Sequence, residues 1–298
     1  MASSLLKPAP LRAWARLCPL DAPAPLRLWH LASLDAPTVA VAWALAFAHA
    51  AGVRLPAWAP VLLALGTWTV YIGDRLLDAR AGLRAGTLHH LRERHDFHWR
   101  HRRLLIPLAV VTAAAAAAII FVLMPAGLRE RNSVLGVAAL AYFSGVHSRR
   151  EAPAWLAPLL SKELLVGVLF TAGCALPTFT RMRLSAPASA LWVMLAPVIF
   201  YAALAWLNCH AIERWESARN TPHAARIFTT AGLLAFIGLL LASVFAPVQA
   251  RAAALFAAGA ASALLLALLD RMRIRLTPLA LRAAADLALL TPLVLALR

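Results

Sequence analysis

The stretch PAWAPVLLALGTWTVYIGDRLLD, residues 56–78, joins a membrane-length apolar run to two acids. Its first 18 residues, 56–73, carry no charge, and about 20 apolar residues suffice for a helix to cross a bilayer. Asp74 and Asp78 follow, four residues apart, where two carboxylates share one helix face and repel each other. A helix that ends near them also presents its negative dipole end to both. The stretch therefore predicts a membrane span whose end attracts a cation.

The composition of the whole chain is that of a polytopic membrane protein. Of its 298 residues, 62% are hydrophobic and 14% are charged, and the mean hydropathy is +0.73. Such values exclude a soluble enzyme of one or two domains. The apolar runs predict a nine-helix all-α transmembrane bundle, with no sizeable soluble domain between the spans. The nine predicted spans are approximately 36–53, 56–73, 104–128, 132–148, 164–180, 184–209, 227–250, 252–269 and 276–297.

Two segments lie outside this pattern. Residues 1–35 are rich in proline and alanine and predict a loosely ordered lead-in, with an interfacial helix around Trp14 and Trp29. They lack a continuous apolar segment, so a cleaved signal peptide is not expected. The transmembrane domain, 36–298, contains one long polar insert, 79–103. The cysteines, Cys18, Cys174 and Cys209, are too far apart for a disulfide framework or a zinc motif.

The basic residues predict the orientation of the spans. A net charge of +16 would suit nucleic acid or an anionic lipid surface, but most of the basic residues lie between the apolar runs. With the N-terminus in the cytoplasm, the inside segments hold 21 Lys and Arg and the outside segments seven. This bias follows the positive-inside rule. We therefore expect a multi-pass protein of a bacterial cytoplasmic membrane, in contact with membrane lipid and without a nucleic-acid partner.

A second acidic group follows the sixth span, in LNCHAIERWESARN (207–220). In this orientation the second and sixth spans both end on the cytoplasmic side, so their acids can face each other. Mg²⁺ prefers such carboxylates together with substrate phosphates. The alternative is that each acid pairs with the arginine beside it in the sequence. The acids are Asp74, Asp78, Glu213 and Glu216, and the neighbouring arginines are Arg75, Arg80 and Arg214.

These residues resemble the UbiA-type membrane prenyltransferase superfamily. That family has nine transmembrane helices and an Asp-rich motif, N-D-x-x-D-x-x-x-D, at the ends of the second and sixth. VYIGDRLLD (70–78) matches the last two acids of the motif, with Asp74 and Asp78, while Val70 and Tyr71 replace its first two residues.

The second motif is matched more loosely by NCHAIERWE (208–216). Asn208 falls on the motif Asn and Glu216 on its last acid, whereas Ile212 replaces the central acid and Glu213 lies one residue further along. The stretch YFSGVHSRREAPAWLAPLLSKELLVGVLF (142–170) also resembles the family between its fourth and fifth helices, and Lys162 falls on a lysine thought to contact pyrophosphate.

The resemblance implies Mg²⁺-dependent transfer of an isoprenyl group from an isoprenyl pyrophosphate to a hydrophobic acceptor, either aromatic or lipid. It implies that Asp74, Asp78 and Lys162 are catalytic. Metal ligands would come from Asp74, Asp78, Glu213 and Glu216. The substrate would be bound by Arg75, Arg149, Asn208 and Tyr142, with further aromatic residues lining an apolar chamber. These are Phe143, Phe200, Tyr201 and Trp206.

Other readings remain open. The incomplete second motif also suits an inactive family member that acts as a membrane scaffold or lipid-binding protein. A small transporter would require two related halves, which the sequence does not show, and a CDP-alcohol phosphotransferase would require an Asp-Gly motif that is absent after Asp78.

Three further features of the sequence have alternative explanations. The insert 79–103 holds His89, His90 and, at steps of three, His95, His98 and His101. These last three could form a metal-binding face, but an Arg-rich interfacial helix over the site mouth fits the insert better. Arg282 and Asp286, four apart in the ninth span, predict an intrahelical ion pair, and His147 could face the mouth.

Overall fold

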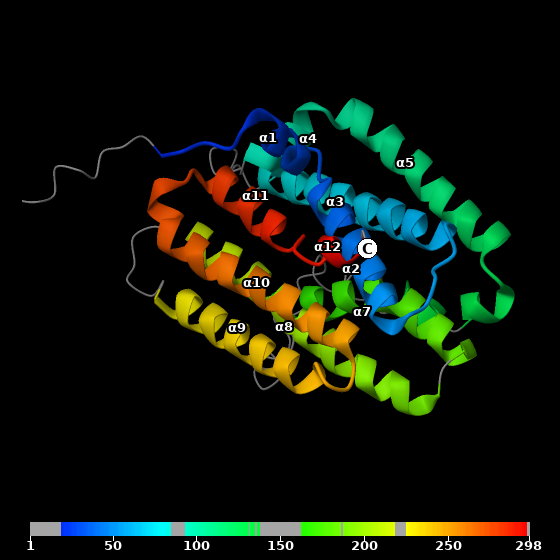
Figure 1. Cartoon of the computed structure of the whole chain (residues 1–298). Coiled ribbons are helices and arrows are strands. Elements are labelled where there is room, and N and C mark those ends of the chain that lie inside the picture. Colours follow the sequence, from blue (N-terminus) through cyan, green and yellow to red (C-terminus); the bar gives the residue numbers. More distant parts are fainter. Residues whose placement is uncertain are drawn as a thin grey trace, which may run out of the picture.

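The computed structural model describes residues 19–84, 93–130, 132–134, 136–137, 162–185, 187–217 and 225–296. These residues form helices, of which the long ones lie roughly alongside one another (Figure 1). Apart from an isolated bridge between Leu20 and Leu276, the described residues contain no β-structure. The helices are α1 (Ala24–Leu31), α2 (Asp35–Ala51), α3 (Trp58–Arg84), α4 (Glu93–Arg100), α5 (Arg102–Ala118) with the π-helical turn η3 (Ile119–Leu123), α7 (Lys162–Ser185), α8 (Ala188–Ser217), α9 (Ala225–Phe245), α10 (Ala250–Met272) with the 3₁₀ turn η5 (Arg273–Arg275), α11 (Pro278–Ala288) and α12 (Leu293–Ala296).

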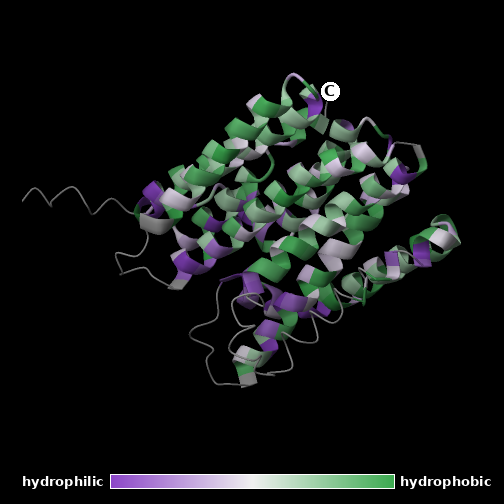
Figure 2. Cartoon of the chain, turned by 90° about the horizontal axis from the view of Figure 1, so that it is seen from below, coloured by the Kyte–Doolittle hydropathy of each residue, from purple (hydrophilic) through white to green (hydrophobic). Residues whose placement is uncertain are grey.

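The described helices include several that are built to cross a membrane. Five are long and apolar enough, namely 102–123, 162–184, 188–216, 227–245 and 250–275, and α1 with α2 adds a sixth if this pair, bent by 87°, forms one broken span. Apolar residues cover most of the helix lengths, while hydrophilic residues gather near helix ends (Figure 2). The chain is therefore a helical membrane protein, as its composition predicts.

Eight of the nine predicted spans coincide with helices, and the fourth lies almost entirely outside the described residues. Of these eight, the second (α3) and the ninth (α11 and α12) are not among the helices that are long and apolar enough to cross a membrane. The predicted ends are less accurate. Helix α3 runs on to Arg84 and α8 to Ser217, so the acids of both clusters lie within helices. The ninth span is broken between α11 and α12, where Pro292 cannot donate a backbone hydrogen bond.

The lead-in also differs from the prediction, because residues 19–35 contact the bundle. The backbone N–H of Leu20 donates to Arg275 at 2.7 Å, and that of Thr277 donates to Leu20 at 2.9 Å. Trp29 lies on α1 as expected, but His30, Ser33 and Asp35 are buried. The bundle therefore begins about 17 residues before the predicted start of the membrane domain.

Helix α2 lies at the centre of the bundle and packs against α3, α7, α10, α11 and α12. Its Trp43 has no exposed surface, donates its indole N–H to the carbonyl of Leu289 at 2.8 Å, and meets Phe170 and Tyr201 edge-to-face. Such aromatic pairs add to the stabilisation from buried area. The helix therefore connects the first, middle and last parts of the chain.

Two aromatic residues predicted to line a substrate chamber are core residues instead. The ring of Phe200 lies in a space left by Gly238 on α9 and Gly259 on α10, where added Cβ atoms would approach it to 2.7 and 2.5 Å. Tyr201 is fully buried and donates its hydroxyl to Leu255 at 2.9 Å. The prediction was wrong for both residues. An aromatic residue in an apolar helix can pack in the core or line a chamber, and the sequence does not distinguish the two.

Helices α7 and α8 approach each other closely at Gly167. A Cβ atom there would lie 2.7 Å from the backbone nitrogen of Trp206, whereas a Cβ atom at Gly173 of the same helix would meet nothing within 4 Å. Small residues that let backbones touch are typical of membrane helix pairs.

We predict that Gly167→Ala destabilises the protein, because backbone atoms of α8 must move to make room. The expected cost is about 1–3 kcal/mol, typical of overpacking. Thermal unfolding in detergent, with Gly173→Ala as the matched control, measures it. The control should be neutral or slightly stabilising, since alanine favours helix over glycine. Equal effects of the two substitutions would show that the close contact is unimportant.

Candidate functional site

Polar side chains gather at one end of the bundle. Helices α1 and α4 lie across this end, beside the last turns of α3 and the first turns of α11 (Figure 1). Two groups of side chains are distinguished there. We call Asp78, Arg94, His95, Glu216 and Arg282 the outer cluster, and His30, Asp35, Arg75, Asn208 and Asp286 the inner cluster.

The outer cluster joins the acidic parts of α3 and α8 through α4. His95 Nε2 lies 3.8 Å from Asp78 Oδ2, and Arg94 Nε donates to His95 Nε2 at 3.2 Å. Arg94 Nη1 lies 3.4 Å from Glu216 Oε1, which also accepts from Arg282 Nη1 at 2.9 Å. One oxygen of α8 thus holds guanidinium groups from α4 and α11. Because Arg94 and His95 are both buried, this contact is shielded from solvent screening.

Hydrogen bonds at both ends fix α4 in this position. Arg27 of α1 forms an ion pair with Glu93 at the start of α4. His98, which is fully buried, bonds the Arg94 carbonyl through Nδ1 at 2.6 Å and Ser33 Oγ through Nε2 at 3.2 Å. Since a carbonyl only accepts, Nδ1 carries the proton, and the serine hydroxyl can donate to Nε2 of a neutral ring. Burial of His98 favours this neutral form.

The inner cluster lies deeper and unites five helices. His30 Nδ1 bonds Asp35 Oδ2 at 2.6 Å and lies 3.5 Å from Asp286 Oδ2. Asn208 Nδ2 donates to Asp286 Oδ1 at 3.1 Å. Arg75 is 5% exposed, with its guanidinium 5.7 Å from the centre of the Tyr71 ring, and its charge acts on Asp35. Its buried side chain is therefore counted with the inner cluster.

The predicted metal ligands fall on the outer side of these clusters. Asp78 and Glu216 belong to the outer cluster, Asp74 is half-buried one turn before Asp78, and Glu213 is exposed one turn before Glu216. The structure thus brings one acid of each predicted group into a single contact network with α4.

The predicted substrate-binding residues are more scattered. Asn208 lies eight residues before Glu216, about 12 Å along α8, and contacts the inner cluster. Lys162, the first residue of α7, is exposed, and its charge acts on Cys209. Arg149 and Tyr142 lie outside the described residues, as do Phe143, His147, His89 and His90. Trp206 stacks on His210, with ring centres 5.4 Å apart.

The residues that local spacing singled out have partners on other helices. Arg282 donates to Glu216 of α8. Asp286 accepts from Asn208 and lies 3.5 Å from His30. His95, His98 and His101 contact Asp78, Ser33 and the Phe97 carbonyl respectively. They diverge, and within the described chain they form no group that could hold a metal.

His30, Ser33, Asp35 and Arg94 were not predicted as site residues from the sequence. A signal was present in the first three, since HLASLD (30–35) places polar side chains directly before an apolar run. Ionisable groups at the edge of a span indicate buried partners.

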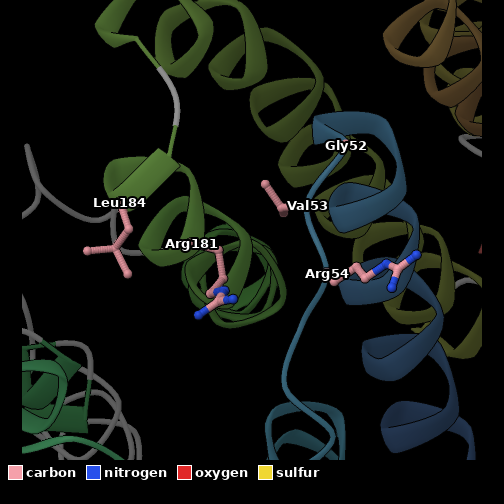
Figure 3. A pocket seen from close by; sticks show the side chains of 5 residues that line it. All are labelled: Gly52, Val53, Arg54, Arg181 and Leu184. Atoms are coloured by element: carbon pink, nitrogen blue, oxygen red, sulfur yellow. The ribbon is translucent and has the colours of Figure 1, made fainter.

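A pocket of the described chain lies away from these clusters. It is lined by Gly52, Val53, Arg54, Arg181 and Leu184, from the α2–α3 connection and the end of α7 (Figure 3). Gly52 follows the last residue of α2, about 25 Å along the helix from Asp35. This pocket is therefore not part of the polar site.

We predict that acid destabilises the protein through His98. Burial, with the nearby Arg75, lowers the pKa of His98 from its usual 6.5 to about 4, against weaker opposing effects of Asp35; His30 and His101 add to the lowering. Below pH 6.5 the unfolded chain takes up a proton that the folded chain does not. The stability should therefore fall as the pH drops from about 6.5 to about 4.

Thermal unfolding in detergent across this pH range measures the effect, with His98→Gln as the comparison. The variant should be less stable at pH 7.5 and show a shallower decline in acid. If it keeps the full pH dependence, other groups are responsible.

The clusters combine acids that can hold a divalent cation with guanidinium groups that can hold a polyanion. No family model, curated protein or solved structure matches this chain.

Proposed function

We propose that the chain is a nine-helix membrane prenyltransferase of the UbiA type, with an isoprenyl pyrophosphate as donor and a hydrophobic acceptor. The observation that carries the proposal is the contact network of the outer cluster. Asp78 and Glu216, 138 positions apart, are linked to adjacent residues of one short helix. Both acids also come from the two segments that carry the family resemblance.

The residues on α3 suit Mg²⁺ better than those on α8. Asp74 and Asp78 lie one turn apart, and Mg²⁺ prefers one or two carboxylates together with substrate phosphates. Glu216 Oε1 is bonded to Arg94 and Arg282, so Mg²⁺ would have to displace a guanidinium there. We therefore assign Mg²⁺ first to Asp74 and Asp78, with Glu213 and Glu216 as further ligands. When bound, it would neutralise charge on the departing pyrophosphate.

The same guanidinium groups suit the pyrophosphate. Arginine binds phosphate with two parallel hydrogen bonds, and Arg94 and Arg282 already meet at Glu216. A pyrophosphate offers them more acceptor oxygens than one carboxylate does. Its binding would draw the guanidinium groups away and release Glu216 for the cation. Lys162 and Arg149 are further donors in this proposal, while Arg75 and Asn208 hold the inner cluster.

The reaction needs little from the protein beyond charge and shape. The bond between the allylic carbon and the pyrophosphate oxygen breaks, and the pyrophosphate leaves with the bonding electrons. The allylic carbon then bonds to the acceptor, which loses a proton. An apolar bundle excludes water, which would otherwise capture the allylic cation.

A second function is favoured by one observation. Glu216 is already neutralised by Arg94 and Arg282, which is what a purely structural ion-pair network requires. On that reading the chain is an inactive family member that acts as a membrane scaffold or lipid-binding protein.

Binding of labelled prenyl pyrophosphates of several chain lengths, with and without Mg²⁺, separates the two functions. We expect Mg²⁺-dependent binding that falls roughly tenfold to a hundredfold in Asp74→Asn and Asp78→Asn, the loss of a charge-assisted contact. Asp96→Asn is the matched control, since Asp96 pairs with Arg100 on the exposed side of α4.

Unchanged binding in both variants, with lower thermal stability, would make the acids structural and favour the scaffold. Product formation should then be absent with every acceptor tested.

The orientation is tested separately by reporter fusions. The basic residues place the polar insert in the cytoplasm, and seven predicted spans separate it from the last residue. Fusions after Arg103 and after Arg298 should therefore report opposite sides of the membrane. The same side for both would mean that the number of spans is wrong by an odd number.

A further inference from the structure

The inner cluster brings nitrogen and oxygen ligand atoms from separate helices to one point. One ligand atom each of His30, Asp35 and Asp286 lies within 4.8 Å of the other two, and among the described residues this is the group that could hold a metal ion. His30 and Asp35 are 3% and 2% exposed. Charged groups are buried this deeply only when they are paired or bind a metal.

The hydrogen bonds of this group leave two carboxylate oxygens facing one imidazole nitrogen. Asp35 Oδ1 accepts from the backbone N–H of Ala36 at 2.8 Å, and Asp286 Oδ1 accepts from Asn208 at 3.1 Å. The two Oδ2 atoms therefore both face His30 Nδ1, at 2.6 and 3.5 Å. That nitrogen carries at most one proton, and the shorter bond to Asp35 takes it.

A fourth ligand atom lies beside the group. Asn208 is 5% exposed, and its Oδ1 has no hydrogen-bond partner among the described residues although its Nδ2 bonds Asp286. A buried amide oxygen without a partner is unfavourable, so an occupant is expected. A bound cation would satisfy this oxygen, and an extra proton on His30 would not.

We propose that His30, Asp35 and Asp286 bind a divalent transition metal such as Mn²⁺ or Zn²⁺, with Asn208 Oδ1 as the fourth ligand. The mixture of imidazole and carboxylate suits such metals better than Mg²⁺, which prefers oxygen alone. Ligand atoms around a tetrahedral metal with bonds of about 2.1 Å lie about 3.4 Å apart. The observed separations of 2.6 and 3.5 Å bracket this value.

The metal would fasten the first and last described helices together. Two carboxylates carry two negative charges, of which buried Arg75 offsets one. A divalent ion would compensate the carboxylate of Asp286, which lies 3.5 Å from His30 Nδ1. The competing arrangement is a protonated His30, aided by Arg75, whose charge acts on Asp35. The ion would join α1, α2, α8 and α11, and this proposal stands apart from the transferase reaction, whose cation is assigned to α3.

Purified full-length protein, stripped with a chelator and titrated with Mn²⁺ alone, tests the proposal. Electron paramagnetic resonance should show one tightly bound equivalent, and ¹⁵N labelling of histidine should reveal one coupled imidazole nitrogen. Binding should also raise the thermal midpoint. Absence of a tight equivalent, or a bound ion without imidazole coupling, would overturn the proposal with the wild-type protein alone.

Variants then locate the ion. His30→Gln and Asp286→Asn should each lose the bound equivalent, whereas His49→Gln, at the other end of α2, should retain it with its coupling. The double variant Asp74→Asn/Asp78→Asn should also retain it. Retention of the coupled ion in His30→Gln, or its loss in the double variant, would place the metal elsewhere and refute the site.

Discussion

Burial of charge inside an apolar bundle is the constraint on which this structure depends. Glu216 sits at the crossing of α8, α4 and α11 and is stabilised because Arg94 and Arg282 reach the same oxygen. In water an ion pair of this kind contributes little, but a charge left alone in a low-dielectric interior is costly. The position of α4 follows from this need, since Arg94 and His95 reach their acids only if α4 lies across the end of the bundle.

The same constraint accounts for the path of the N-terminal segment. Asp35 opens α2, where the positive end of the helix dipole favours an acid, and His30 reaches it from the preceding helix. The sharp bend of 87° between α1 and α2 is what allows the imidazole to meet the carboxylate. Ser33 lies inside that bend and forms a hydrogen bond with His98 of α4. The lead-in is therefore part of the polar site as well as of the fold.

The apolar runs were sufficient to predict most helices, because a span must be long and uncharged. Their ends were not predictable in this way, since α3 continues beyond its apolar run to Arg84, and the ninth run is broken between α11 and α12, where Pro292 lies. The acids of α3 and α8 were found because each pair lies on one helix face. Arg282 was assigned to Asp286, four residues away, and its hydrogen bond to Glu216 was not predicted. Such a pairing depends on how the helices cross. The spacing of residues within one helix gives no information about that crossing.

The contact between Asp286 and His30 sets a limit on how this protein can be made. Asp35 and Asp286 are separated by 251 positions, so the first polar residues enter the membrane long before their partner is synthesised. Until α11 arrives, the carboxylate of Asp35 has only His30 and Arg75 to compensate it, and the bend after α1 lacks its contact with the last helices. Chaperones and membrane proteases that act on incomplete chains would meet these polar side chains without their last partner. Insertion of α11 supplies that partner, Asp286.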